Sequence, residues 1–301
     1  MKILLFGANG QVGHELRRSL APLGEIVATT RSGRLDGGAC EVADFDSPDA
    51  LPALIERIAP SLVVNAAAYT AVDKAESDRD AAFRANGEAP SRIAETCARI
   101  GIPLVHYSTD YVFDGTGNRP YREDDPTAPL GVYGESKLAG EQGIRASGAA
   151  HMILRTAWVY AAHGKNFLRT MLRLGAERDT LGVVADQIGT PTSAGLIADV
   201  TAVLVPRIGP ASGTWHLTAS GEISWHAFAE AIFAGAVSRG LLPRAPTVHP
   251  ISTADYPTPA RRPAYSRLDT SRLRGDFGVE LPEWRTVCDH VLDDIAGSTS
   301  R

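Results

Sequence analysis

Tyr133 and Lys137 stand four residues apart, in the segment Tyr-Gly-Glu-Ser-Lys, and could together move a proton. Residues at this spacing share one face of a helix, so the phenol and the amine can reach the same bound molecule. A free phenol has a pKa of about 10, and a nearby ammonium group favours its charged form. The pair would then donate and accept protons near neutral pH. A surface pair without function is the alternative for this spacing taken alone.

A glycine-rich turn lies close to the N-terminus, in MKILLFGANGQVG. The apolar run 3–6 predicts a strand, the glycines predict a tight turn, and the segment HELRRSL predicts a helix. Glycine lets a phosphate approach the backbone, and the start of a helix offers unpaired N–H groups and the positive end of its dipole. We therefore expect a dinucleotide pyrophosphate at the turn that contains Gly7, Gly10 and Gly13. A tight turn without a ligand is the alternative.

The next two predicted strands indicate how the rest of a dinucleotide would bind. Strand 25–30 ends at Thr30 and Arg31, where an acidic residue would instead hold the ribose 2′-OH of NAD. A hydroxyl beside an arginine suits a 2′-phosphate, so we expect NADPH, with NADH possible; an Arg31 that faces solvent is the alternative. Strand 40–46 ends at Asp44 and Phe45, which could hold adenine by a hydrogen bond and a ring face.

Two buried strands in the middle of the chain place further candidates at strand ends. Strand 61–68 ends in small side chains, among them Ala67 and Ala68, which leave room for a flat cofactor. A helical region follows Tyr69 and reaches residue 99. Strand 103–107 leads to Thr109, and polar residues at the carboxyl end of such a strand point into the ligand crevice. We therefore expect Thr109 to contact substrate, and the long loop 115–130 to be a functional flap.

The second half of the chain predicts a smaller set of elements. Strand 150–160 contains Trp158, either a core residue or a wall of a substrate pocket. Helices are predicted at 167–178, 193–205 and after Ser224, with strands at 181–192 and 215–220. The proline-rich tail 243–267 is expected to be irregular. Its Arg261, Arg262 and Arg267 could meet a diphosphate, with solvated charge as the alternative.

These elements predict an α/β protein with a Rossmann-like doubly wound parallel sheet and a smaller C-terminal substrate-binding α/β domain. We expect the dinucleotide-binding domain at residues 1–160, completed by part of 180–220. Residues 161–301 would mainly form the substrate domain. A chain of 301 residues suits one main domain with a smaller appendage.

Composition excludes several classes of protein. The net charge is −5 with both signs dispersed, so no basic surface for nucleic acid is expected. No apolar run approaches the roughly 18 residues of a membrane span, and we expect a cytoplasmic protein. The three cysteines, Cys40, Cys97 and Cys288, match no metal or disulfide spacing and are expected to be structural.

Taken together, the motifs resemble the dTDP-4-dehydrorhamnose reductases of the extended short-chain dehydrogenase/reductase family. The resemblance runs nearly from end to end. It rests on GANGQVG, VNAAAYTAVDKAESD, VHYSTDYVFDGTG, VYGESKLAGE, RTAWVY, NFLRTMLRL, DQIGTPT and YPTPARRPAYSRLDT. The resemblance implies reduction of the 4-keto group of a dTDP-4-keto-6-deoxy sugar by NADPH or NADH.

The resemblance also implies roles for individual residues. Tyr133 would donate the proton, Lys137 would hold the nicotinamide ribose and tune the phenol, and Thr109 would bind the keto oxygen. Gly10, Gln11 and Val12 match the pyrophosphate turn of the family, and the other matching cofactor positions are Asp44, Phe45, Ala68, Tyr69, Thr70 and Tyr107. The matching sugar-nucleotide positions are Thr109, Asp110 and Trp158, and we name Tyr111, Asn166 and Arg262 as further candidates for the substrate site.

Some members of this family bind magnesium at a dimer interface through glutamates. Glu15 matches one such position, but the residues around Gly195 supply no second carboxylate. The sequence therefore names no metal ligand, leaves Mg²⁺ open, and fits a monomer or a homodimer.

Two other functions remain open at this stage. A related sugar-nucleotide epimerase or dehydratase also uses the Tyr-x-x-x-Lys pair but keeps its nicotinamide through the cycle. A non-catalytic regulatory subunit would normally lack part of the Thr, Tyr and Lys set, and all three are present here.

Overall fold

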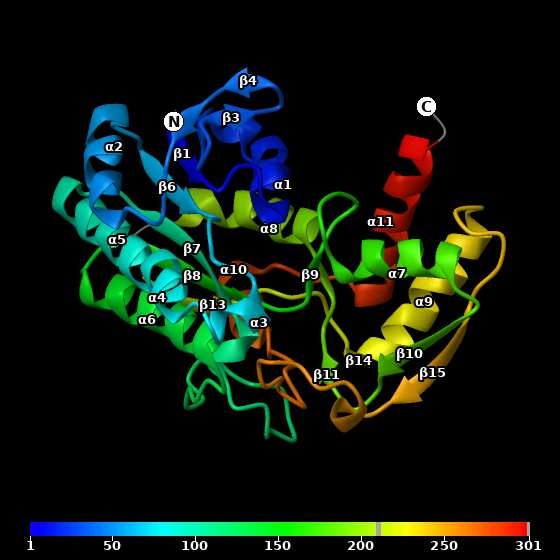
Figure 1. The fold of residues 1–301 in the computed structure, drawn as a ribbon. Coiled ribbons are helices and arrows are strands. Elements are labelled where there is room, and N and C mark those ends of the chain that lie inside the picture. The colour runs from blue at the N-terminus through cyan, green and yellow to red at the C-terminus, as the bar shows by residue number, and fades with distance from the viewer. Residues whose placement is uncertain (209–211, 300–301) are drawn as a thin grey trace.

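The computed structural model describes residues 1–208 and 212–299. Its centre is a seven-stranded sheet in which all neighbours run parallel, in the order β13-β8-β7-β6-β1-β2-β5 (Figure 1). Its strands are β1 (Lys2–Phe6), β2 (Glu25–Thr30), β5 (Glu41–Val42), β6 (Leu62–Asn65), β7 (Leu104–Thr109), β8 (His151–Thr156) and β13 (Gly213–His216). The order reverses between β1 and β6, the place where doubly wound sheets bind ligands beyond the carboxyl ends of their strands. The predicted Rossmann-like fold is confirmed.

Helices cover both faces of this sheet because side chains alternate along each strand. Ile3 and Leu5 of β1 pack on the face of α1, α8 and α10, whereas Leu4 and Phe6 pack on the face of α2, α5 and α6. The first face carries α1 (Gln11–Ser19), α8 (Ala194–Leu204) and α10 (Ser271–Phe277), and the second carries α2 (Leu51–Ile58), α5 (Ala89–Ile100) and α6 (Val132–Ala146).

A second lobe lies at the far end of the molecule from α2 and α5, on the right of Figure 1. Its apolar core joins α7 (Phe167–Glu177), α9 (Trp225–Ser238) and α11 (Trp284–Thr299) to the parallel pair β10 (Thr180–Val184) and β15 (Thr247–Ile251). Short two-residue pairs complete the fold: β3 (Arg34–Leu35) with β4 (Gly38–Ala39), β9 (Val159–Tyr160) with β12 (Thr192–Ser193), and β11 (Ile188–Gly189) with β14 (Ile223–Ser224).

Two predictions of secondary structure need correction. The tail 243–267 is not irregular throughout, because β15 pairs with β10; its Pro250 is tolerated since both strands of this pair are edges. The single helical region expected to reach residue 99 is divided into α3 (Val72–Ala75), α4 (Arg79–Phe83), a π-helical turn (Arg84–Glu88) and α5. Ser224 begins α9 and its hydroxyl accepts the N–H of Ala227.

Among the described residues, no helix combines the length and the apolar character needed to cross a membrane. Cys97 and Cys288 are buried in the two apolar cores, and all three cysteines are free thiols.

Candidate active site

Thr109 and Tyr133 meet where β7 ends and α6 begins. Thr109 is the last residue of β7 and is buried, and its hydroxyl lies close enough to the phenol of Tyr133 to lower the pKa of that phenol. Tyr133 is the second residue of α6, and its ring packs edge-on against Tyr111 with centroids 5.6 Å apart. The two groups that the sequence assigns to the keto oxygen therefore lie together.

The surroundings of Tyr133 raise the pKa of its phenol. Burial is the largest cause and the charge of Asp110 adds to it, while the neighbouring hydroxyl of Thr109 acts in the opposite direction. Our expectation that Lys137 would lower this pKa needs correction. The Lys137 amine is turned toward β7, where it donates to the carbonyl oxygen of Tyr107 at 2.6 Å. In this arrangement the phenol is protonated at neutral pH.

Lys137 lies one helical turn beyond Tyr133 and is 2% exposed. Burial lowers the pKa of its amine to about 8, and the charge of Glu141 acts in the opposite direction. The Nζ atom also lies 3.4 Å from Nε2 of His106. The amine is therefore close to its titration point in the physiological range.

Asp110 is the buried acid of the site. Its Oδ1 accepts the hydroxyl of Thr109 at 2.9 Å, whereas its Oδ2 is buried with no hydrogen-bond partner among the described residues. Burial raises the pKa of Asp110 to about 6, while the nearby hydroxyls of Ser266 and Thr109 act in the opposite direction. An unpaired buried acceptor is costly, and a substrate hydroxyl would satisfy it.

Arg262 joins the C-terminal tail to this group. It donates to Asp73 of α3 at 2.8 Å and to the hydroxyl of Tyr111 at 3.4 Å. The other two tail arginines lie elsewhere: Arg261 is exposed, and Arg267 is paired with Glu222 at 3.2 Å. Of the three tail arginines, Arg262 is the one placed at the Tyr111–Tyr133 rings.

The glycine turn has the bare backbone that a pyrophosphate needs. Gly7 has φ +76°, and a Cβ there would stand 2.6 Å from the backbone nitrogen of Ala67. A Cβ on Gly13 would overlap the carbonyl oxygen of Gly7. Gly10 is exposed and is the N-cap residue of α1, and because glycine has no side chain it does not cap the helix. The first N–H groups of α1, at Gln11, Val12 and Gly13, lack intrahelical partners, so the turn fits an anionic diphosphate.

Two of the residues expected around adenine and its ribose, Thr30 and Phe45, contact other residues of the chain. Thr30 is 2% exposed, and its hydroxyl bonds the backbone of Arg34 at 3.2 Å. Phe45 is 6% exposed and packs edge-on against Phe6, so its ring belongs to the core and is not a free platform for adenine. Arg31 is exposed and lies 3.5 Å from Asp44. Arg31 and Asp44 thus keep accessible charged groups at this edge.

The segment after β6 is more open. Ala68 and Thr70 are exposed and Ala67 is half-buried, as a surface for a flat cofactor requires. The N–H of Tyr69 donates to Asn86 at 2.8 Å, which fixes the course of this segment. The side chain of Tyr107, which we expected at the cofactor, lies in the core instead, where its hydroxyl pairs with Thr201 of α8. The backbone carbonyl of Tyr107 faces Lys137.

Trp158 and Asn166 each contact residues other than the Tyr133 group. Trp158 is half-buried with φ +46°, and its ring stacks on Trp225 with centroids 3.5 Å apart, so it is not a core residue. Asn166 begins α7, where Oδ1 accepts the N–H of Arg169 and Nδ2 donates to Gln11 at 2.8 Å. Asn166 therefore lies beside the glycine turn, and the structure does not bring it to the Tyr133 group.

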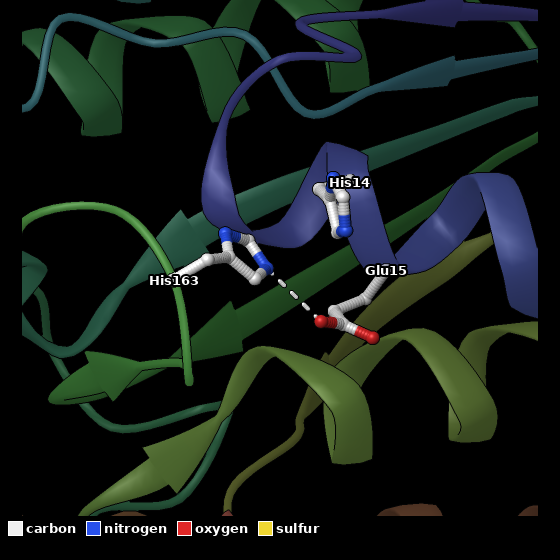
Figure 2. A group of neighbouring side chains, drawn as sticks. All are labelled: His14, Glu15 and His163. Atoms are coloured by element: carbon white, nitrogen blue, oxygen red, sulfur yellow. Dashed lines mark hydrogen bonds and ion pairs between the residues drawn. The ribbon is translucent and has the colours of Figure 1, made fainter. Parts of the chain in front are cut away.

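His14, Glu15 and His163 form a separate cluster at α1, drawn in Figure 2. Nε2 of His163 lies 3.0 Å from Oε1 of Glu15, and the two imidazole rings are 4.2 Å apart between centroids. Mg²⁺ prefers oxygen ligands, and this group offers one carboxylate and two imidazoles. The donor set around Glu15 therefore does not fit magnesium, and the hydrogen bond ties α1 to the segment before α7.

Sequence reasoning missed a buried polar group under α6. Asn65 and His106 are each 1% exposed, and Nδ2 of Asn65 lies 3.1 Å from Nδ1 of His106. Glu141 is held in a fork by Arg155 at 2.8 and 2.7 Å. The available signal was a polar residue inside an otherwise apolar strand, as in LVVN and PLVHY.

Comparison with known proteins agrees with this geometry. A family model described as the RmlD substrate binding domain matches residues 1–296. The chain is 51% identical to a dTDP-4-dehydrorhamnose reductase of Burkholderia thailandensis, over 98% of this chain and 99% of that protein. Two solved structures are similar with TM-scores of 0.89. One is a dTDP-4-dehydrorhamnose reductase from Clostridium acetobutylicum, 36% identical over 98% of this chain and 99% of that one. The other, from Bacillus anthracis and in complex with NADP, is 33% identical over 97% and 99%.

The parallel sheet, the glycine turn and the Thr–Tyr–Lys group define an NAD(P)-dependent oxidoreductase of the short-chain dehydrogenase/reductase type. Within that class, the chain belongs to the RmlD substrate binding domain family.

Proposed function

We propose that this enzyme uses NADPH to reduce the 4-keto group of dTDP-4-dehydro-6-deoxy-L-mannose to dTDP-L-rhamnose, the last step of dTDP-rhamnose biosynthesis. The observation that carries the proposal is that the hydroxyl of Thr109 and the phenol of Tyr133 lie together at the carboxyl end of β7, with Lys137 one turn away on α6. Identity to curated reductases over the full chain supports the choice of substrate.

The proposed chemistry divides between the cofactor and the chain. When bound, reduced nicotinamide supplies a hydride to the carbonyl carbon. Thr109 holds the carbonyl oxygen and Tyr133 donates the proton to it. Because burial raises the pKa of Tyr133, the phenol is in its protonated form and ready to donate. Lys137 holds the nicotinamide ribose, and Asp110 accepts a sugar hydroxyl through its unpaired Oδ2.

Further assignments belong to the same proposal. Residues 1–160, with part of 180–220, bind the cofactor, and residues 161–301 mainly bind the sugar nucleotide. NADPH is favoured over NADH because β2 ends at Thr30 and is followed by the exposed Arg31, where an NAD-specific site would carry an acidic residue, and the Arg31 guanidinium can meet a 2′-phosphate. We propose a cytoplasmic monomer or homodimer without nucleic-acid partners.

The test is a spectrophotometric assay of NADPH oxidation with the purified protein and dTDP-4-keto-6-deoxy sugar, with the product identified by NMR. Stoichiometric NADPH loss with formation of dTDP-L-rhamnose is expected. An epimerase retains its nicotinamide through the cycle, so sugar conversion without net NADPH oxidation would contradict the proposal. UDP-4-keto sugars serve as the control for the nucleotide base.

A further inference from the structure

The amine of Lys137 is buried against the backbone of β7. Its one short hydrogen bond in the described structure goes to the carbonyl oxygen of Tyr107 at 2.6 Å. The next polar atom is Nε2 of His106 at 3.4 Å. Both Lys137 and His106 are almost completely buried. The low dielectric of the interior therefore strengthens the electrostatic interaction between the imidazole and the amine.

Asn65 fixes which nitrogen of His106 carries the proton. The backbone N–H of Ala67 donates to the Asn65 side chain at 3.1 Å, which identifies the atom facing it as Oδ1. The other end, Nδ2, faces Nδ1 of His106 at 3.1 Å. An amide nitrogen only donates, so Nδ1 must accept, and the neutral ring then carries its proton on Nε2.

The Nε2–H group of His106 therefore points at the amine of Lys137. A charged ammonium has only N–H donors, so this arrangement sets donor against donor. An uncharged amine has a lone pair that accepts from Nε2–H while one of its own N–H groups donates to Tyr107. A charged imidazolium would be still less favourable, and burial together with the Lys137 charge lowers the pKa of His106 well below its usual value.

The remaining charged groups near Lys137 do not reproduce this effect. Glu141 lies one turn further along α6 and favours the ammonium. Its charge is shared with Arg155 of β8 and Arg145 of α6, at 2.7 and 2.6 Å. Tyr133 lies one turn before Lys137 on the same helix and is protonated. His106 is the titratable residue that β7 turns toward the amine.

We propose that Asn65 and His106 are positioning residues for Lys137: Asn65 fixes the ring so that its Nε2–H favours the uncharged amine, and the pair thereby sets the pH at which Lys137 changes charge. The inference rests on the proposed reductase function for its kinetic readout. The pair contacts neither the keto group nor its proton donor, and acts through Lys137.

Asn65→Asp tests the direction of the effect. The carboxylate keeps an acceptor for Ala67 and replaces the N–H donor that faces His106 with a second acceptor. The ring then turns its proton to Nδ1 and offers a lone pair to the Lys137 ammonium. The alkaline limb of the kcat profile should move to higher pH by about one unit or more. A shift of one pKa unit is a tenfold change in the ratio of charged to uncharged amine at a given pH.

Two further variants separate this effect from added charge and from simple loss of structure. Asn65→Leu removes the donor without adding charge, frees the ring to change tautomer, and should move the limb in the same direction. Thr201→Val breaks the bond to Tyr107 on the other face of β7, and should leave the pH profile in place even if stability falls. An unmoved limb in both Asn65 variants, or an equal shift in Thr201→Val, overturns the proposal.

A readout without substrate distinguishes this inference from the proposed function. In protein labelled with ¹⁵N-histidine, the His106 signals, identified by their loss in His106→Gln, should show the neutral Nε2–H tautomer. In Asn65→Asp they should show a proton on Nδ1. An Nδ1–H tautomer in the unmodified protein overturns the inference, whereas failure to reduce the sugar nucleotide overturns only the function.

Discussion

At the scale of single residues, the environment of Tyr133 determines its chemistry more than the residue type does. Burial and the charge of Asp110 hold its proton on, and the Lys137 amine is directed at the β7 backbone. A tyrosine kept neutral in this way is suited to reduction, in which the growing alkoxide takes the proton. The same group would be a poor base for the reverse reaction until conditions become more alkaline.

Tyr133→Phe should retain the ring and its edge-on packing with Tyr111 while removing the proton. We expect kcat to fall by about a hundredfold or more, the usual scale for a general acid, with NADPH affinity little changed. Stopped-flow or steady-state absorbance measures the first quantity and fluorescence titration with NADPH the second. Normal turnover by this variant would show that another group donates the proton.

The charged form of Asp110 should measurably destabilise the folded protein. Its folded-state pKa of about 6 lies above the unfolded value, so the folded protein holds this proton more tightly. The penalty is absent below the unfolded pKa of about 4, develops as the pH rises to about 6, and is full above it, at most about 3 kcal/mol. Asp110→Asn should therefore stabilise the protein at pH 7 relative to pH 4.5.

Urea unfolding of both proteins at the two pH values checks this difference. The variant should also lose affinity for the sugar nucleotide, because an amide replaces the carboxylate oxygen left free for it. A stability difference between variant and unmodified protein that stays constant with pH would contradict the pKa.

Motifs located the reactive residues because their spacing is a helix property: Tyr133 and Lys137 share a face whatever surrounds them. The motifs did not predict in which direction the side chains of strands and loops point. Phe45 and Tyr107 point into the core, and Asn166 turns to Gln11, since those directions depend on register and on packing partners far along the chain. The role of His106 depends on an asparagine 41 residues away.

At the scale of elements, apolar runs were sufficient to predict most of the parallel sheet. Strands buried on both faces are apolar without alternation, and β1 and the first three residues of β6 follow that pattern. The pattern failed for β15, where His249 and Pro250 lie in an edge strand exposed to solvent. The pairing with β10 decides that segment, and pairing is not visible in local sequence.

The contact between α1 and the end of β1 makes Gly13 a sensitive position. A Cβ there would overlap the Gly7 carbonyl, so Gly13→Ala must displace the turn that precedes α1. We expect a loss of about 1–3 kcal/mol in stability, the usual cost of overpacking. The NADPH dissociation constant should also rise by about tenfold, which corresponds to about 1.4 kcal/mol.

Gly275→Ala in α10 is the matched control, because a Cβ there meets nothing within 4 Å. It should leave NADPH binding unchanged and stability equal or slightly higher, as alanine favours a helix over glycine. Thermal unfolding and NADPH titration of the pair measure both effects. Equal behaviour of the two variants would mean that the turn has room to move.

At the scale of the whole molecule, the tail 256–267 connects the C-terminal half to the candidate active site. Arg262 carries this connection through Asp73 and Tyr111, and the backbone N–H of Ala260 also donates to Asp73 at 3.3 Å. The arginine belongs to the C-terminal half of the chain but is held by Asp73 and Tyr111 of the N-terminal half. Its guanidinium retains donors for an anionic substrate, because five N–H groups exceed the two contacts it makes.

Arg262→Met should therefore weaken substrate binding more than catalysis. The KM for the dTDP-keto sugar should rise by about tenfold or more from the loss of a charge-assisted hydrogen bond, with kcat within about threefold. Asp73→Asn keeps the arginine but loosens it, and should raise KM less. Arg267→Met, whose guanidinium is paired with Glu222, is the control and should leave KM in place. If kcat falls in Arg262→Met while KM is unchanged, the arginine orients Tyr111 and Tyr133 and does not bind the diphosphate.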